Sequence, residues 1–324
     1  MTRVRLIGAA ATALLCLTFA PAPAAAATAP RMALPADRLH FGLSNDPTEL
    51  GWMTSSGVPW RYRFQYLAGG VNTGGGWATW NSPAGQFATL YMNASTAAPA
   101  SYIPVFTYYM LLQSQPSTGA DESARDYSNL NNAATMAAYY ADFKLLMQKA
   151  GAYGKPVVVH VEPDLWGYLQ QRAGGGAAST VSASVASSGF AEAAGLPNNV
   201  QGFAQALLNL RDSYAPNASM AVHASMWSSS IDVASDTDPN LDARAKADKT
   251  AAFLNSTGSW DYVFNDVDDH NAAWWEQNGQ SRWWDPQNVR FPNFSRYLAW
   301  VSELRTRTSR PQVVWQVPMG NQYF

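Results

Sequence analysis

The sequence predicts an α/β protein built on a parallel sheet, and two observations predict this class. Short runs of β-branched and aromatic residues alternate with longer segments in which apolar residues recur every three or four positions. Strands that alternate with helices pair in parallel and are covered by those helices. The number of repeats fits a (β/α)8 TIM-barrel-like fold. An open doubly wound sheet is the alternative, but no glycine-rich phosphate loop opens any of the expected helices, which disfavours a nucleotide-binding version.

Each element is expected from its local pattern. The expected strands are Leu39–Ser44, Tyr62–Leu67, Tyr102–Tyr108, Pro156–Val161, Met220–Met226, Tyr262–Phe264 and Gln312–Val317. The clearest helices are Ala133–Ala150, Val200–Tyr214, Asp242–Leu254 and Asn293–Arg307, with Asp242 and Asn293 as N-caps. Seven strands are one short of a full barrel, so we expect either a seven-stranded, partly open barrel or a C-terminally truncated one. The Gly-, Ala- and Ser-rich stretch Ala173–Ala194 is expected to be a flexible loop near a strand end.

The N-terminus has the pattern of an export signal. Arg3 and Arg5 precede an apolar run, and small residues up to Ala27 supply a cleavage site. We therefore expect residues 1–27 to be a signal peptide, residues 28–324 to be a single barrel domain, and the mature protein to be secreted and extracellular. The only cysteine, Cys16, lies in this signal, so the mature chain has no thiol for a disulfide, a metal site or a nucleophile.

The composition narrows the range of partners. The chain has 21 basic and 23 acidic residues without a basic stripe, which disfavours nucleic acid, and no apolar run after the signal suggests a membrane. It is rich in aromatic residues, with 13 Trp, 15 Tyr and 13 Phe, and several Trp lie in loop-like sequence. Exposed aromatic faces stack on sugar rings, although such Trp also seal loops. The expected partner is a carbohydrate, bound by a monomer without a cofactor.

The fourth expected strand carries the most informative residues. In Pro156-Val-Val-Val-His-Val-Glu-Pro-Asp164, side chains alternate between the two faces, so His160 and Glu162 are expected to share the inner face of the barrel. Pro163 ends the strand because proline has no backbone N–H to donate. A buried carboxyl is costly without a partner, so Glu162 is a candidate functional group, followed by Asp164. A structural carboxylate paired with arginine, for example Arg63, is the alternative.

The sixth expected strand ends in acidic residues. Asp266 alternates with Tyr262 and Phe264 and is expected at the mouth of the barrel, across from Glu162. Asp268, Asp269 and His270 follow in the loop, where one of them could instead cap the next helix. We expect at least one of these acids to act in the site.

Further polar and aromatic residues are expected near the strand ends that build sites in parallel barrels. His223 and Trp227 are expected on one face of the fifth strand, and Tyr108 or Tyr109 ends the third. The remaining candidates are Arg63, Gln65, Trp166, Trp275 and Gln316.

These residues resemble those of secreted barrel-fold glycoside hydrolases. The resemblance rests on Val-His-Val-Glu-Pro-Asp at the fourth strand, the acids of the sixth, and Trp-Gln-Val-Pro at the seventh. It implies that Glu162 is the acid/base carboxyl. The nucleophile of many such enzymes ends the seventh strand, where this chain has Gln316, so the second carboxyl is assigned to Asp266, with Asp269 in reserve. Two carboxyl groups then hydrolyse a glycosidic bond.

Two other functions stay open at this point. His160, His223, Glu162 and an acid of the sixth strand would converge on a metal ion in a metal-dependent hydrolase, although no close-spaced metal motif supports this. A non-catalytic polysaccharide-binding barrel would explain Gln316 and the missing eighth strand.

Overall fold

The computed structural model describes residues 38–46, 50–97, 99–267, 270–285, 287–289 and 291–317, and all structural statements concern these residues. The expected signal peptide lies outside them, as do Asp268 and Asp269. Signal cleavage and the roles of these two acids therefore stay predictions.

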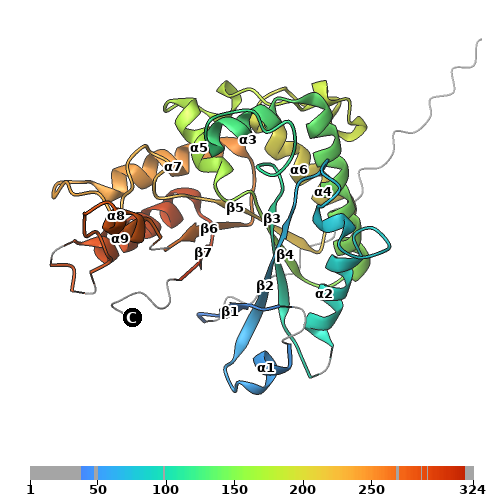
Figure 1. The fold of residues 1–324 in the computed structure, drawn as a ribbon, viewed down its shortest axis with the longest axis horizontal. Helices are drawn as coiled ribbons and strands as arrows, with labels where there is room; N and C mark the ends of the chain where they lie inside the picture. The colour runs from blue at the N-terminus through green and yellow to red at the C-terminus, as the bar shows by residue number, and fades with distance from the viewer. Residues whose placement is uncertain are drawn as a thin grey trace, which may run out of the picture.

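A seven-stranded parallel sheet forms the centre of the molecule. Its strands pair in chain order, each with the next one along the sequence. They are β1 (Phe41–Ser44), β2 (Trp60–Ala68), β3 (Ile103–Tyr109), β4 (Val157–Val161), β5 (Ala218–His223), β6 (Tyr262–Asp266) and β7 (Gln312–Trp315). The sheet curls into a half-barrel with helices on its outer side (Figure 1). This confirms the expected α/β, barrel-like class in a seven-stranded, partly open form.

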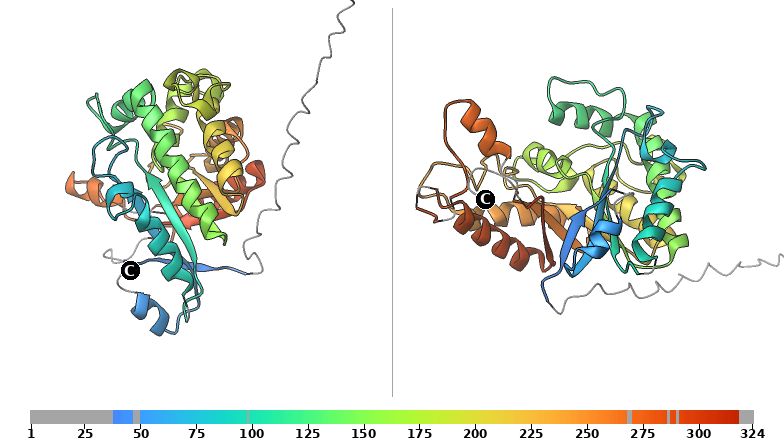
Figure 2. Two further views of the ribbon diagram at one scale, coloured as in Figure 1. Left: turned by 90° about the vertical axis from the view of Figure 1, so that its right-hand side faces the viewer. Right: turned by 60° about the horizontal axis from the view of Figure 1, so that its bottom comes forward.

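Helices fill the connections between the strands (Figure 2). They are α1 (Leu50–Ser55), α2 (Gln86–Thr96), α3 (Glu122–Leu130), α4 (Ala133–Tyr153), α5 (Leu165–Ala173), α6 (Val200–Tyr214), α7 (Ala243–Thr257), α8 (His270–Gln277) and α9 (Asn293–Thr308). Within the described ranges, no helix combines the length and the apolar character that crossing a membrane requires.

The two faces of the sheet pack against different cores. On the outer face, Val157, Val159 and Val161 join the large core formed with the helices. On the inner face, Val158 packs with residues of three other strands in a smaller core, namely Ile103, Val105, Ala221 and Phe264. The strict alternation along β4 is therefore the one that the sequence predicts up to His160.

The two expected helix caps have different outcomes. Asp242 accepts a hydrogen bond from the Ala245 backbone N at 3.0 Å, so it caps α7 as predicted. The prediction for Asn293 is wrong, because Pro292 occupies the N-cap position of α9. Asn293 is buried, accepts a hydrogen bond from the Asp285 N at 3.1 Å and donates one to the Ala234 carbonyl. Its side chain thus ties α9 to two loops instead of capping it.

The stretch 173–194 also differs from the expectation of a loop at the strand end. It contains three short 3-10 turns, Ala178–Thr180, Ala186–Ser188 and Ala191–Ala193, and buries Val181 and Val185 in the large core. Tyr140 of α4 donates a hydrogen bond to the Ser184 carbonyl at 3.1 Å. The stretch therefore belongs to the helical layer.

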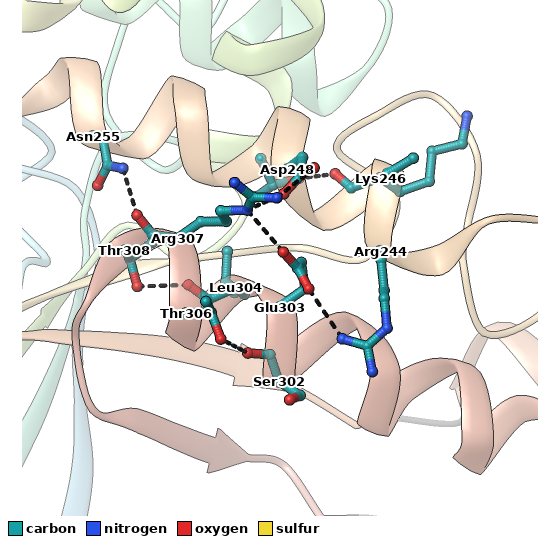
Figure 3. A network of polar contacts seen from close by, with 12 residues as sticks. Arg244, Lys246, Asp248, Asn255, Ser302, Glu303, Leu304, Thr306, Arg307 and Thr308 are labelled. Atoms are coloured by element: carbon teal, nitrogen blue, oxygen red, sulfur yellow. Dashed lines mark hydrogen bonds and ion pairs between the residues drawn. The ribbon is translucent and has the colours of Figure 1, made fainter.

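A network of charged side chains joins α7 to α9 on the surface (Figure 3). Arg307 lies 2.7 Å from both Asp248 and Glu303, and Arg244 lies 3.0 Å from Glu303. Such exposed pairs contribute little to stability, because water and salt screen their charges. The buried Trp300 and Leu304 of α9 therefore contribute more to the packing of this helix pair.

Candidate active site at the strand ends

Glu162 does not face the interior of the half-barrel. Its φ of +42° breaks the alternation directly after β4. Its Oε1 accepts hydrogen bonds from the backbone N of Met110 at 3.0 Å and of Leu111 at 3.1 Å, and from the Tyr139 hydroxyl at 2.9 Å. Tyr139 belongs to α4 in the outer layer. The predicted placement of Glu162 beside His160 and across from Asp266 is therefore wrong, because strand alternation ends where the backbone turns left-handed.

Glu162 belongs to a group of four acidic side chains that we name the carboxyl cluster: Glu122, Asp126, Glu162 and Asp164. Glu122 and Asp126 lie one turn apart on α3 and so share a face of that helix. Burial raises the pKa of Glu162 to about 8, although its three hydrogen bonds act in the opposite direction. Burial, followed by the charges of Glu162, Glu122 and Asp164, raises the pKa of Asp126 to about 9. Burial therefore favours the protonated form of both carboxyls.

The members of the carboxyl cluster differ in exposure. Glu162 and Asp126 are buried, and within the described part of the chain the Asp126 Oδ1 has no hydrogen-bond partner. Glu122 and Asp164 are half-buried. The Tyr109 hydroxyl donates to Glu122 Oε1 at 2.9 Å. The cluster thus combines two buried carboxyls with raised pKa values and two carboxyls that are partly exposed.

A second group of polar residues crosses the inner face of the sheet. Thr107 Oγ1 lies 3.1 Å from His160 Nδ1, and His160 Nε2 lies 3.1 Å from His223 Nδ1. His223 Nε2 is 3.4 Å from Asp266 Oδ1, a longer contact without hydrogen-bond geometry. These four residues come from β3, β4, β5 and β6 and form a row, which we name the histidine chain. The inward placement of His160, His223 and Asp266 agrees with the alternation of their strands.

His160 lies in an apolar environment. Its ring stacks on the ring of Phe264, with the centroids 4.3 Å apart, and forms a T-shaped contact with the ring of Trp315, with the centroids 5.0 Å apart. Burial, with a further contribution from His223, lowers the pKa of His160 well below its ordinary value. The imidazole of His160 is therefore neutral.

Aromatic side chains cover the inner face between these two groups. The ring of Tyr66 packs against the rings of Tyr109 and Trp315, with centroid-to-centroid distances of 6.4 Å and 6.0 Å. All three side chains are half-buried. Tyr109 bonds to Glu122 at one end of this aromatic platform, and Trp315 pairs with Asp266 in the sheet register at the other. Gln316, at φ +49°, donates from Nε2 to the Tyr66 hydroxyl at 3.1 Å. The platform therefore links the carboxyl cluster to the histidine chain.

Three predicted site residues lie on the wrong face for a barrel interior. Arg63 is buried under α2, where it donates to Asn45 Oδ1 at 2.7 Å and to Ser95 Oγ at 3.2 Å. Tyr108 donates to Asp142 of α4 at 2.7 Å. Gln65 alternates with Tyr66 on β2 and accepts a hydrogen bond from the Tyr66 backbone N at 2.8 Å. The prediction misplaced β2 by one residue, which moves every side chain to the opposite face, and of the two tyrosines left open for β3 the structure places Tyr109 inward.

The three tryptophans that were predicted to bind substrate lie in different environments. Trp166 is buried against Phe203 and Trp260, so it is a core residue and the prediction of substrate contact is wrong. Trp227 lies in the turn after β5, not on it, and packs against Tyr168 at 4.7 Å. Trp275 of α8 stacks under the Arg282 guanidinium at 3.7 Å.

The geometry does not favour the metal-dependent alternative. Each nitrogen of His160 faces a neighbour in the histidine chain, and Glu162 points to the other side of the sheet. Across the described ranges, no three His, Cys, Asp or Glu side chains are grouped as metal ligands.

Sequence reasoning missed Glu122, Asp126, Thr107, Tyr66 and Trp315. The correct register of β2 and β3 would have revealed Tyr66 and Thr107, because both alternate with apolar inward residues. The acids of α3 gave no signal in the sequence, because their helix is not adjacent to β4 along the chain.

The fold and the site together define an α/β half-barrel protein with ionisable groups and an aromatic platform at the carboxyl ends of its strands. No protein-family model matches the chain, and no curated protein matches its sequence.

Proposed function

We propose that this protein is a secreted glycoside hydrolase that cleaves a polysaccharide or oligosaccharide with two carboxyl groups. The aromatic platform of Tyr66, Tyr109 and Trp315 carries this proposal. Half-buried aromatic faces stack on sugar rings, and this platform has carboxyl groups at both ends.

In this mechanism the carboxyl cluster supplies the acid. Glu162 and Asp126 hold protons at neutral pH, because their pKa values are raised to about 8 and about 9. They are buried, so half-buried Asp164 is the member that reaches a ligand, and we assign it as the acid that protonates the leaving-group oxygen. Asp266, with a side chain 22% exposed, is the second carboxyl, which attacks the anomeric carbon or activates water.

Release of reducing sugar from a panel of plant, fungal and bacterial polysaccharides tests the proposal. We expect one substrate to be cut, and Asp266→Asn and Asp164→Asn to lower kcat by about 10²–10⁴-fold, the usual contribution of acid–base groups. Asp248→Asn, a surface change on α7, is the control and should keep full activity. Cleavage by both site variants at the wild-type rate would overturn the site assignment.

A non-catalytic polysaccharide-binding protein is the second candidate. Exposed Trp80 and Trp274 favour it, with exposed fractions of 43% and 55%, as does the neutral Gln316 after β7. Binding of a polysaccharide without release of any product would identify this function.

Secretion is proposed from the N-terminal pattern alone. N-terminal sequencing of protein recovered from the culture medium should begin after Ala27. Detection of uncleaved protein in the cell fraction only would contradict this. Sedimentation of the mature protein should give the mass of a monomer.

A further inference from the structure

The histidine chain has an unusual property for a buried polar group. Thr107, His160 and His223 are all buried, and each contact between neighbours uses one atom of each residue. A neutral imidazole has one nitrogen that donates and one that accepts. The role of one nitrogen therefore determines the role of every other atom in the row.

The Asp266 carboxylate is at the end of this row and only accepts when ionised. Its Oδ1 is buried and lies 3.4 Å from His223 Nε2, so a lone pair on this nitrogen would be repelled and an N–H is attracted. His223 Nδ1 must then accept from His160 Nε2–H. His160 Nδ1 in turn accepts from the Thr107 hydroxyl. The opposite direction would also fill the contacts within the row, but it would turn the lone pair of His223 Nε2 toward the Asp266 carboxylate.

We propose that Asp266 sets a one-way hydrogen-bond chain in which Thr107, His160 and His223 act as positioning residues for its carboxylate. The chain presents His223 Nε2–H to the buried Oδ1, which leaves the exposed part of the Asp266 side chain free toward the mouth of the half-barrel. The direction of the chain is independent of any activity. Its catalytic consequence, a correctly oriented second carboxyl, rests on the proposed function.

Nitrogen NMR of the full chain labelled with ¹⁵N-histidine tests the direction at neutral pH. The sequence has four histidines, and His40→Gln and His270→Gln remove the signals of the two outside the chain. We expect His160 and His223 each to carry a proton on Nε2 and none on Nδ1. A proton on Nδ1 of either ring, or an imidazolium at His223, would overturn the proposal.

Substitutions at Thr107 test the far end of the chain. Thr107→Val keeps the shape but removes the hydroxyl, so the His160 Nδ1 signal should shift to that of a nitrogen without a hydrogen bond. Thr107→Ser retains the hydroxyl and should keep the wild-type signal. An unchanged Nδ1 signal in folded Thr107→Val protein would show that Thr107 does not donate, which contradicts the assigned direction.

Kinetics with a cleaved substrate then separate this inference from the proposed function. Thr107→Val should lower kcat about five-fold with little change in KM, which is the effect of one hydrogen bond, and Thr107→Ser should restore it. If the NMR result holds but no saccharide is cleaved, the proposed function fails and the chain stands. If a saccharide is cleaved but the histidines have the opposite tautomers, only the proposed direction of the histidine chain is wrong and the proposed function stands.

Discussion

Tyr139 donates its hydroxyl to Glu162 Oε1 at 2.9 Å, which joins a helix outside the sheet to the end of its fourth strand. The same oxygen accepts the backbone N–H groups of Met110 and Leu111 just after β3. Glu162 therefore holds β3, β4 and α4 together. This arrangement gives the residue a structural role in addition to its membership of the carboxyl cluster.

Removal of the Glu162 acceptor should destabilise the protein. Glu162→Ala leaves three buried donors unpaired, and each costs about 1–3 kcal/mol, so we expect a loss of at least about 2 kcal/mol in the free energy of unfolding. Glu162→Gln keeps an oxygen in the same place and should lose much less. Urea unfolding measures both variants, and equal stability of the two would contradict the structural role.

Asp126 should make stability depend on pH. Its carboxyl has an ordinary pKa of 3.8 and a folded pKa of about 9, so between these values the folded state holds a proton that the unfolded state has lost. The contribution of this carboxyl to the free energy of unfolding is therefore greatest below pH 4. It falls as the pH rises toward 9, by up to ~1.4 kcal/mol per pH unit. Glu162 acts in the same direction between 4.5 and about 8.

Asp126→Asn should flatten this dependence, measured as urea midpoints between pH 5 and pH 8. Asp248→Asn on the surface of α7 serves as the control and should keep the wild-type slope. A wild-type slope in Asp126→Asn would mean that the Asp126 carboxyl is ionised in the folded protein.

Gly167 of α5 allows Trp227 to approach closely. A Cβ at this position would lie 2.6 Å from the Trp227 ring, so Gly167→Ala must displace the ring and should cost about 1–3 kcal/mol. Trp fluorescence and thermal unfolding report the change. Gly51→Ala in α1, where nothing lies within 4 Å, is the matched control and should be neutral or slightly stabilising.

Arg63 should affect stability and not ligand affinity. Arg63→Met removes hydrogen bonds to Asn45, Ser95 and two backbone carbonyls, and we expect a loss of about 2–4 kcal/mol. Arg61→Met, two residues earlier on the same face of β2, loses one contact of 3.5 Å and should change little. A folded Arg63→Met protein of wild-type stability with weakened saccharide binding would restore the original site prediction.

The fold was largely predictable because it depends on patterns within short segments. All seven strands and the four clearest helices were placed within a few residues, since apolar periodicity reports which face of an element is buried. The inward positions of His160 and Asp266 followed from the same alternation. The faces of β2 and β3 did not. β2 carries its aromatic residues on the inner face and arginine and glutamine on the outer face, which reverses the usual apolar-out pattern, and β3 carries large aromatic residues on both faces.

The sequence by itself determined the seven parallel strands with their helices, the inward histidines and the acidic end of β6, and the structure decided that the sheet forms a half-barrel. Only the tertiary structure decided the orientation of Glu162, the partners of Arg63 and the grouping of the carboxyl cluster. The physical reason is that these features depend on contacts between distant segments. A left-handed turn at Glu162 is stabilised by donors from residues 110, 111 and 139, and no pattern around residue 162 encodes those donors.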